Sequence, residues 1–165
     1  MKKYIRLLAA SLALLVLLAM TVSCGNESLS ARERLSSLLA LFGNAPAGAC
    51  YATLPSDGDS TLDERLIAAL YVRADGYLEY EGRVSECALY LGSAGDPFFE
   101  AAVFVCYGNA DTRAVVEMCL RRARLVSSVH AIAEGDIVLT VSGRTVCYMI
   151  TPRTSAARDA MDHCF

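Results

Sequence analysis

The chain has 165 residues, of which 55% are hydrophobic and 20% charged, and this composition excludes a disordered or low-complexity protein. Its net charge is −3 at pH 7, but Lys2, Lys3 and Arg6 all precede Cys24, so that from Cys24 onward 12 basic side chains stand against 18 acidic ones, a net charge of −6. Such an acidic chain lacks the basic surface that neutralises phosphates, which excludes nucleic acid as a partner.

The N-terminus has the pattern of a bacterial lipoprotein signal. A cationic stretch, MKKYIR, precedes fourteen uncharged residues, LLAASLALLVLLAM, a length typical of a signal-peptide core, whereas a membrane-spanning helix needs roughly 20 residues. The triplet Thr21-Val22-Ser23 and then Cys24 resemble the site at which a cysteine thiol receives a diacylglycerol, although Thr21 departs from the usual leucine. We predict a signal peptide over 1–23, lipidation of Cys24, and anchoring on the extracytoplasmic face of the cell membrane.

Two other ways of processing this N-terminus stay open. If the apolar run continues through Ser23, it is long enough to serve as an uncleaved membrane anchor in which Cys24 is incidental. An ordinary secretory signal could also be cut near this point without lipid. The two anchored readings, a lipidated Cys24 and an uncleaved helix, both place residues 25–165 outside the cytoplasmic membrane. A diacylated or triacylated cysteine carries more than one acyl chain, which stable anchoring needs.

A lipid-anchored tether and a short helix are predicted over 24–44. Ser30 with Glu33 three residues later is a capping-box pattern, and Gly43 is a typical residue after a helix end. The apolar residues recur at helical spacing on one face, namely Leu35, Leu38, Leu39 and Phe42.

The next part of the chain, up to residue 83, contains one predicted helix between two connections. The stretch 43–60 is rich in Gly, Pro, Asp and Ser and is predicted to be irregular. Thr61 and Glu64 form a second capping-box pattern before the helix LDERLIAALYV, and RADGYLEYEGR (73–83) is a connection anchored by its tyrosines.

Two apolar runs, ECALYLGS (86–93) and EAAVFVCYG (100–108), predict strands. Because both of their alternating faces are apolar, we expect central strands covered on two sides, or a sheet with an occluded outer face. TRAVVEMCLRRARLVSSVH (112–130) predicts a long helix whose arginines Arg121, Arg122 and Arg124 lie outward, with Glu117 four residues before Arg121.

The end of the chain predicts a hairpin and a closing helix. Two β-branched runs, DIVLTV and RTVCYMIT, flank a two-residue turn at Ser142-Gly143, and SAARDAMDHCF follows Pro152. The order of elements predicts a single α+β domain over 45–165, with a mainly antiparallel sheet of about four strands packed with helices.

Six cysteines remain after Cys24, and they favour structural thiols. Most lie inside predicted strands or on a buried helix face, where cysteine acts as a small hydrophobe. At least one disulfide stays open as an alternative in an exported chain, with Cys87–Cys106 or a bridge using Cys50 as the candidates. No CxxC pair is present in the sequence, so neither a redox motif nor a metal site is predicted.

The sequence indicates no catalytic residues and no cofactor. The acidic stretch 56–64 departs from a calcium loop at its glycine and glutamate positions, which indicates a solvated loop instead. Four tyrosines could line a binding surface or serve as half-buried packing, namely Tyr77, Tyr80, Tyr90 and Tyr107.

The second half also resembles a known family. The segment SECALYLGSAGDPFFEAAVFVCYGNADTRAVVEMCLRRARLV, followed by VSGRTVCYMIT, is similar to bacterial exported lipoproteins of the domain-of-unknown-function family numbered 4358. The resemblance covers about residues 45–155 and rests on apolar patterning. It implies a lipid-anchored, exported α+β domain, and it carries no catalytic residues with it.

We therefore predict a membrane-anchored exported lipoprotein that is a non-catalytic binding or interaction module of the cell envelope. Its partner would be an envelope protein or a small ligand. One alternative is an envelope hydrolase that uses carboxylates such as Glu86 and Glu100, and another is a small-molecule-binding lipoprotein.

Overall fold

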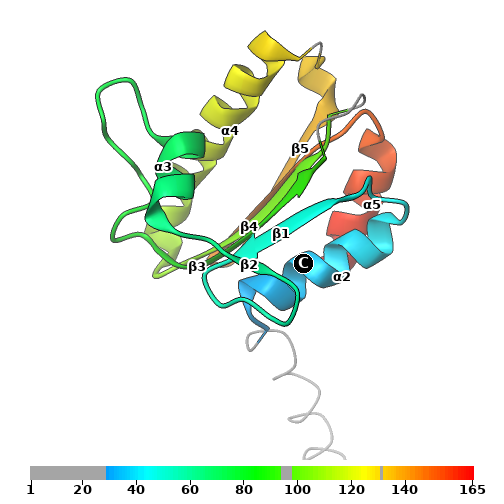
Figure 1. Ribbon diagram of the computed structural model, residues 1–165, viewed down its shortest axis with the longest axis horizontal. Helices are drawn as coiled ribbons and strands as arrows, with labels where there is room; N and C mark the ends of the chain where they lie inside the picture. The colour runs from blue at the N-terminus through cyan, green and yellow to red at the C-terminus, as the bar shows by residue number, and fades with distance from the viewer. Residues whose placement is uncertain (1–28, 94–97, 131) are drawn as a thin grey trace, which may run out of the picture.

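The computed structural model describes residues 29–93, 98–130 and 132–165, and Figure 1 shows their arrangement. The predicted signal peptide, Cys24 and most of the tether lie outside the described residues. Within the described ranges, no helix is long and apolar enough to cross a membrane.

A single mixed sheet runs through the centre of the molecule. Its six strands have the spatial order β2-β1-β3-β4-β6-β5, and every neighbouring pair is antiparallel except β1 and β2. The strands are β1 (Gly48–Ala52), β2 (Ser60–Thr61), β3 (Val84–Gly92), β4 (Glu100–Cys106), β5 (Ile137–Ser142) and β6 (Thr145–Ile150). The α+β class and the mainly antiparallel sheet are confirmed, but the prediction of about four strands was wrong.

The two strands missed by the sequence are β1 and β2, both in the stretch predicted to be irregular. β1 has only five residues, GACYA, and it is held by its pairing with β3 across the register Gly48↔Gly92 to Ala52↔Ala88. Gly48 allows this close approach, because an added Cβ would lie 2.3 Å from the carbonyl oxygen of Leu91. Non-local pairing therefore decided the structure of a segment whose local composition favours loops.

Helices cover both faces of the sheet. The described helices are α2 (Ala31–Phe42), α3 (Glu64–Tyr71), α4 (Thr112–Val129) and α5 (Thr154–Cys164), with short 3-10 turns at Asn109–Asp111 and Glu134–Asp136. α3 and α4 lie on one side of the sheet, and α2 and α5 lie on the other (Figure 1). Each pair of helices closes its own hydrophobic core against the sheet.

The central strands are buried as predicted. Every residue of β4 and β6 is buried, since their side chains alternate between the two cores. On the α3/α4 side, Phe104 and Tyr148 pack with Met118, while on the α2/α5 side Val103 and Met149 pack with their own helices. The reading of central strands covered on two sides is confirmed, and it explains why these runs have no polar face.

Helix and turn boundaries were predicted with small errors. The Ser30–Glu33 capping box and the end of α2 at Gly43 are confirmed. α3 instead begins after Asp63, whose side chain accepts a hydrogen bond from the Leu66 amide, because Thr61 is occupied in β2. The hairpin turns at Gly143-Arg144, one residue later than predicted, with Ser142 paired to Thr145.

Candidate functional site

A cavity of about 460 Å³ opens between α3, the segment 72–83 and the end of β4. Its apolar wall is formed by Ile67 of α3, Leu78 of the segment and Val84 at the start of β3. Two aromatic rings, Tyr80 and Tyr107, complete the lining, and we call it the Tyr80–Tyr107 cavity. A cavity of this size that combines an aliphatic wall with aromatic and polar groups is large enough for a small molecule.

The charged residues of the Tyr80–Tyr107 cavity lie at its rim. Glu64, Arg65 and Glu81 line it and are exposed, and none of the three has an ion-pair partner among the described residues. The two carboxylates outnumber the one guanidinium, so the rim carries a net negative charge. The carboxylates of Glu64 and Glu81 are therefore open to a ligand of positive charge.

The two tyrosines differ in burial. Tyr107 is 64% exposed, whereas Tyr80 is half-buried. Burial raises the pKa of Tyr80, and the nearby Cys87, Tyr107 and Glu64 add to the rise. Tyr80 therefore stays a neutral phenol at physiological pH, and its ring forms an apolar surface next to an acidic group.

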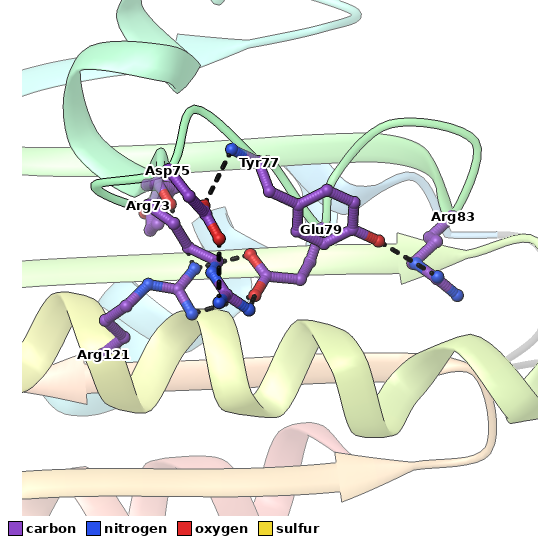
Figure 2. Close-up of polar contacts among 7 residues, drawn as sticks. Arg73, Asp75, Tyr77, Glu79, Arg83 and Arg121 are labelled. Carbon is purple, nitrogen blue, oxygen red and sulfur yellow. Dashed lines mark hydrogen bonds and ion pairs between the residues drawn. The ribbon is translucent and has the colours of Figure 1, made fainter.

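The outer wall of the cavity is held in place by a buried ion pair (Figure 2). Glu79 of the segment 72–83 is 5% exposed, and its two oxygens accept hydrogen bonds from Arg121 of α4 at 2.9 and 2.5 Å. Arg73, near the start of the same segment, also pairs with Glu79: its Nη1 lies 3.9 Å from the Glu79 Oε1. Burial acts against ionisation of Glu79, but the hydrogen bonds from Arg121 hold the pKa of its carboxyl group below the usual range.

Further contacts fix both ends of this segment. Asp75 pairs with Arg73 at 3.0 Å and accepts a hydrogen bond from the backbone amide of Tyr77. The Tyr77 hydroxyl accepts a hydrogen bond from Arg83 at 3.3 Å, and Arg83 also pairs with Asp111 before α4 (Figure 2 shows the first of these contacts). The segment that carries Leu78 and Tyr80 is thus a braced wall rather than a loose loop.

The sequence identified this segment only as a connection and missed the role of Glu79. Arg121 was expected to face outward and to pair with Glu117, but Glu117 pairs with Arg113 instead, and Arg121 turns to Glu79. The available sequence signal was that Glu79 stands between Leu78 and Tyr80, an apolar and an aromatic neighbour, in a segment predicted to be a connection anchored by its tyrosines.

The structure brings together part of the predicted tyrosine surface. Tyr80 and Tyr107 line the cavity, and Tyr77 lies on the same segment with its ring 5.8 Å from the Arg73 guanidinium carbon. Tyr90 is separated from them, because it packs in the α2/α5 core and donates a hydrogen bond to the Pro46 carbonyl at 2.6 Å.

The two carboxylates of the hydrolase alternative do not meet. Glu86 accepts a hydrogen bond from the Ala31 amide at the start of α2, on one face of the sheet. Glu100 lies with the opposite core, and the register pairs Glu86 with Val105 but Glu100 with Leu91. Five residues of ladder, roughly 17 Å, separate the two positions along the strands. Glu86 and Glu100 therefore cannot act on one bond.

Glu100 is part of a buried polar cluster. It is 0% exposed and accepts hydrogen bonds from Arg122 at 2.7 to 3.3 Å and from the Tyr148 hydroxyl. The Tyr148 hydroxyl in turn contacts that of Tyr71 at 2.7 Å. The prediction that Arg122 faces outward was wrong, since its side chain is only 13% exposed and neutralises this buried carboxylate.

The cysteines described by the structure are all free thiols. Cys87 faces Phe104 across the ladder and Cys106 faces Val84, so the alternative of a Cys87–Cys106 disulfide is not realised. Burial raises the pKa of Cys50 and of Cys106 to about 11 in each case, and raises that of Cys87 well above its usual value. Within the described ranges, no group of three or more acidic, histidine or cysteine side chains could hold a metal ion.

Comparisons of this chain with protein-family models, with curated proteins and with solved structures found no match. The resemblance to the family numbered 4358 stays a prediction from the residues that carry it.

Proposed function

We propose that this protein is a lipid-anchored module on the outer face of the cell membrane that binds a small organic cation. The ligand would have a compact apolar body and a positively charged head, and it would occupy the Tyr80–Tyr107 cavity. The proposal is carried by one observation: two tyrosine rings and an aliphatic wall share a cavity with two carboxylates that lack ion-pair partners among the described residues.

The chemistry of this lining suits a cation. The face of an aromatic ring carries negative potential, so a cation near Tyr80 and Tyr107 gains roughly 0.5–2 kcal/mol, depending on how far it is desolvated. Glu64 and Glu81 add attraction at the rim, while Arg65 repels the same ligand. The apolar body of the ligand would rest on Ile67, Leu78 and Val84, and its burial would supply hydrophobic free energy.

The fixed position of the cavity wall supports a binding role for the cavity. The wall that carries Leu78 and Tyr80 is tied to α4 through Glu79 and Arg121. A wall already ordered before the ligand arrives loses little conformational freedom on binding, which leaves more of the contact energy as affinity. This reasoning favours a small-ligand module over the hydrolase, whose two carboxylates lie on opposite faces of the sheet.

The predicted anchor would hold this site close to the membrane. Cys24 and Leu29 are five residues apart, so a lipidated Cys24 would lie within about 18 Å of the start of the described domain. A tether this short keeps the module at the surface. Intact-mass measurement of the protein purified from membranes tests the anchor: we expect a chain beginning at a diacylated or triacylated Cys24, and an unmodified chain beginning at Met1 would refute lipidation.

Ligand binding is tested by titrating the protein in lipid nanodiscs with butyltrimethylammonium, using butanol and butyrate as neutral and anionic comparisons. We expect saturable binding of the cation alone, weakened about tenfold in Tyr107→Ala and in the Glu64→Gln/Glu81→Gln pair. Arg65→Gln should bind more tightly, because it removes a like charge from the rim. Tyr90→Phe, on the opposite face, serves as the matched control. Equal binding of butanol would exclude a cation site.

A further inference from the structure

The sheet has one long free edge, formed by β5. In the described chain β5 pairs only with β6, so its other side has no strand. Its six residues, IVLTVS, include no charged residue and no proline. Proteins usually protect such an edge with lysine, proline or a very short strand, and the opposite edge of this sheet, β2, has only two residues.

The register shows which backbone groups of β5 face outward. The Thr151 amide donates to the Asp136 carbonyl at 2.8 Å, so Asp136 is a hydrogen-bonded position just before β5. Hydrogen-bonded positions alternate along an antiparallel pair, which directs Val138, Thr140 and Ser142 toward β6. The amide and carbonyl groups of Ile137, Leu139 and Val141 therefore point away from the sheet, toward the free side.

A shallow groove of about 280 Å³ lies between this edge and α5. Its lining includes Arg158 and Asp162, which are exposed, lie one helical turn apart and have no ion-pair partner in the described part of the chain. α5 runs in the same direction as β5: its last residues lie beside Ser142, whose hydroxyl donates to the Phe165 carbonyl at 3.1 Å. One positive side chain, Arg158, and one negative side chain, Asp162, thus lie next to each other along the free edge of β5.

We propose that two copies of this chain pair antiparallel along β5, so that the sheet continues across a two-fold axis near Leu139. In this arrangement Ile137 would pair with the partner's Val141, and the outward amides and carbonyls of both strands would be satisfied. The two α5 helices would also run antiparallel. Each Arg158 would then face the partner's Asp162, so the two-fold symmetry would give two copies of this ion pair.

The self-complementary charges favour a second copy over an unrelated extended peptide. A positive and a negative side chain one turn apart on an edge helix match their own two-fold image, with no other sequence required. The arrangement is compatible with anchoring, because a two-fold axis normal to the sheet leaves both α2 helices on the same face of the joined sheet, where both tethers can reach one membrane. The inference does not depend on the ligand proposed for the Tyr80–Tyr107 cavity.

Native mass spectrometry of the full-length protein released from detergent tests this pairing. We expect a dimer in the wild type. Val141→Pro removes an outward amide without removing a hydrogen bond to β6, so this variant should be monomeric, whereas Val141→Ala, which keeps the amide, should remain a dimer. Thermal melting of each variant by circular dichroism shows that the fold is kept.

Charge-reversal variants provide a second, independent test of the dimer. Arg158→Asp alone and Asp162→Arg alone each create two like-charge contacts in the dimer, and each should weaken association about tenfold or more. The double variant Arg158→Asp/Asp162→Arg restores opposite charges and should regain wild-type association. The proposal would be overturned if the wild type were monomeric at every concentration, or if Val141→Pro were still a dimer. It would also be overturned by a monomer that retains a co-purified peptide, or by a double variant that associates no more tightly than the single variants.

Discussion

The buried ion pair between Arg122 and Glu100 provides a sharp test of the packing between α4 and the sheet. In Arg122→Met the carboxylate of Glu100, which is 0% exposed, would keep the hydroxyl of Tyr148 as its only hydrogen-bond donor among the residues that the structure describes. It would lose three hydrogen bonds from Arg122, at 3.1, 3.3 and 2.7 Å. Leaving a buried charge without its partner costs about 3–5 kcal/mol.

The matched control is another arginine of the same helix. Arg113 pairs with Glu117 at 3.5 Å, but their side chains are 91% and 63% exposed, so Arg113→Met should cost less than about 1 kcal/mol. Urea unfolding followed by circular dichroism gives both free energies. The paired variant Glu100→Leu/Arg122→Met should recover most of the loss, because it removes both charges. Equal, small losses in the two single variants would refute a structural role for the buried pair.

Three other predictions concern the β1 region and the thiols. Gly48→Ala should destabilise the domain by about 1–3 kcal/mol because its Cβ would meet the Leu91 carbonyl, whereas Gly135→Ala, with nothing within 4 Å, should be neutral in the same urea assay. A hydrogen bond from Arg32 holds the pKa of Asp59 below its usual range, so the carboxylate stabilises the fold above about pH 4 and this contribution is lost as pH falls further. The stability difference between wild type and Arg32→Met should therefore be largest at pH 7 and shrink toward pH 2; a difference independent of pH would contradict this. Native protein should react slowly with a thiol reagent at pH 8, since burial raises the pKa of Cys87 and Cys147. The proposed lipidation of Cys24 predicts that the unfolded chain exposes six reactive thiols rather than seven.

The parts of the fold that local patterns specify were predicted well. The Ser30 capping box, the two apolar runs of β3 and β4, and the β5–β6 hairpin each carry a signal within a few residues. β1 had no such signal, because GACYA becomes a strand only through pairing with β3, more than 30 residues further along the chain.

The candidate site was less accessible to sequence reasoning. Tyr80 and Tyr107 could be chosen as aromatic candidates, but their meeting in one cavity depends on how the segment 72–83 folds back over the sheet. That path is set by Glu79, whose partner Arg121 lies 42 residues away. The outward placement of Arg121 and Arg122 followed from helical periodicity alone, and it failed because each arginine reaches a buried carboxylate from the margin of the apolar face.

The most direct test of the proposed binding site is nuclear magnetic resonance of the tyrosine rings in the protein reconstituted in nanodiscs. Titration with butyltrimethylammonium should shift the ring signals of Tyr80 and Tyr107 along one saturable curve while those of Tyr90 stay unchanged. Shifts confined to Tyr90, or no shift at Tyr80 and Tyr107 at saturating cation, would contradict a cation site in this cavity.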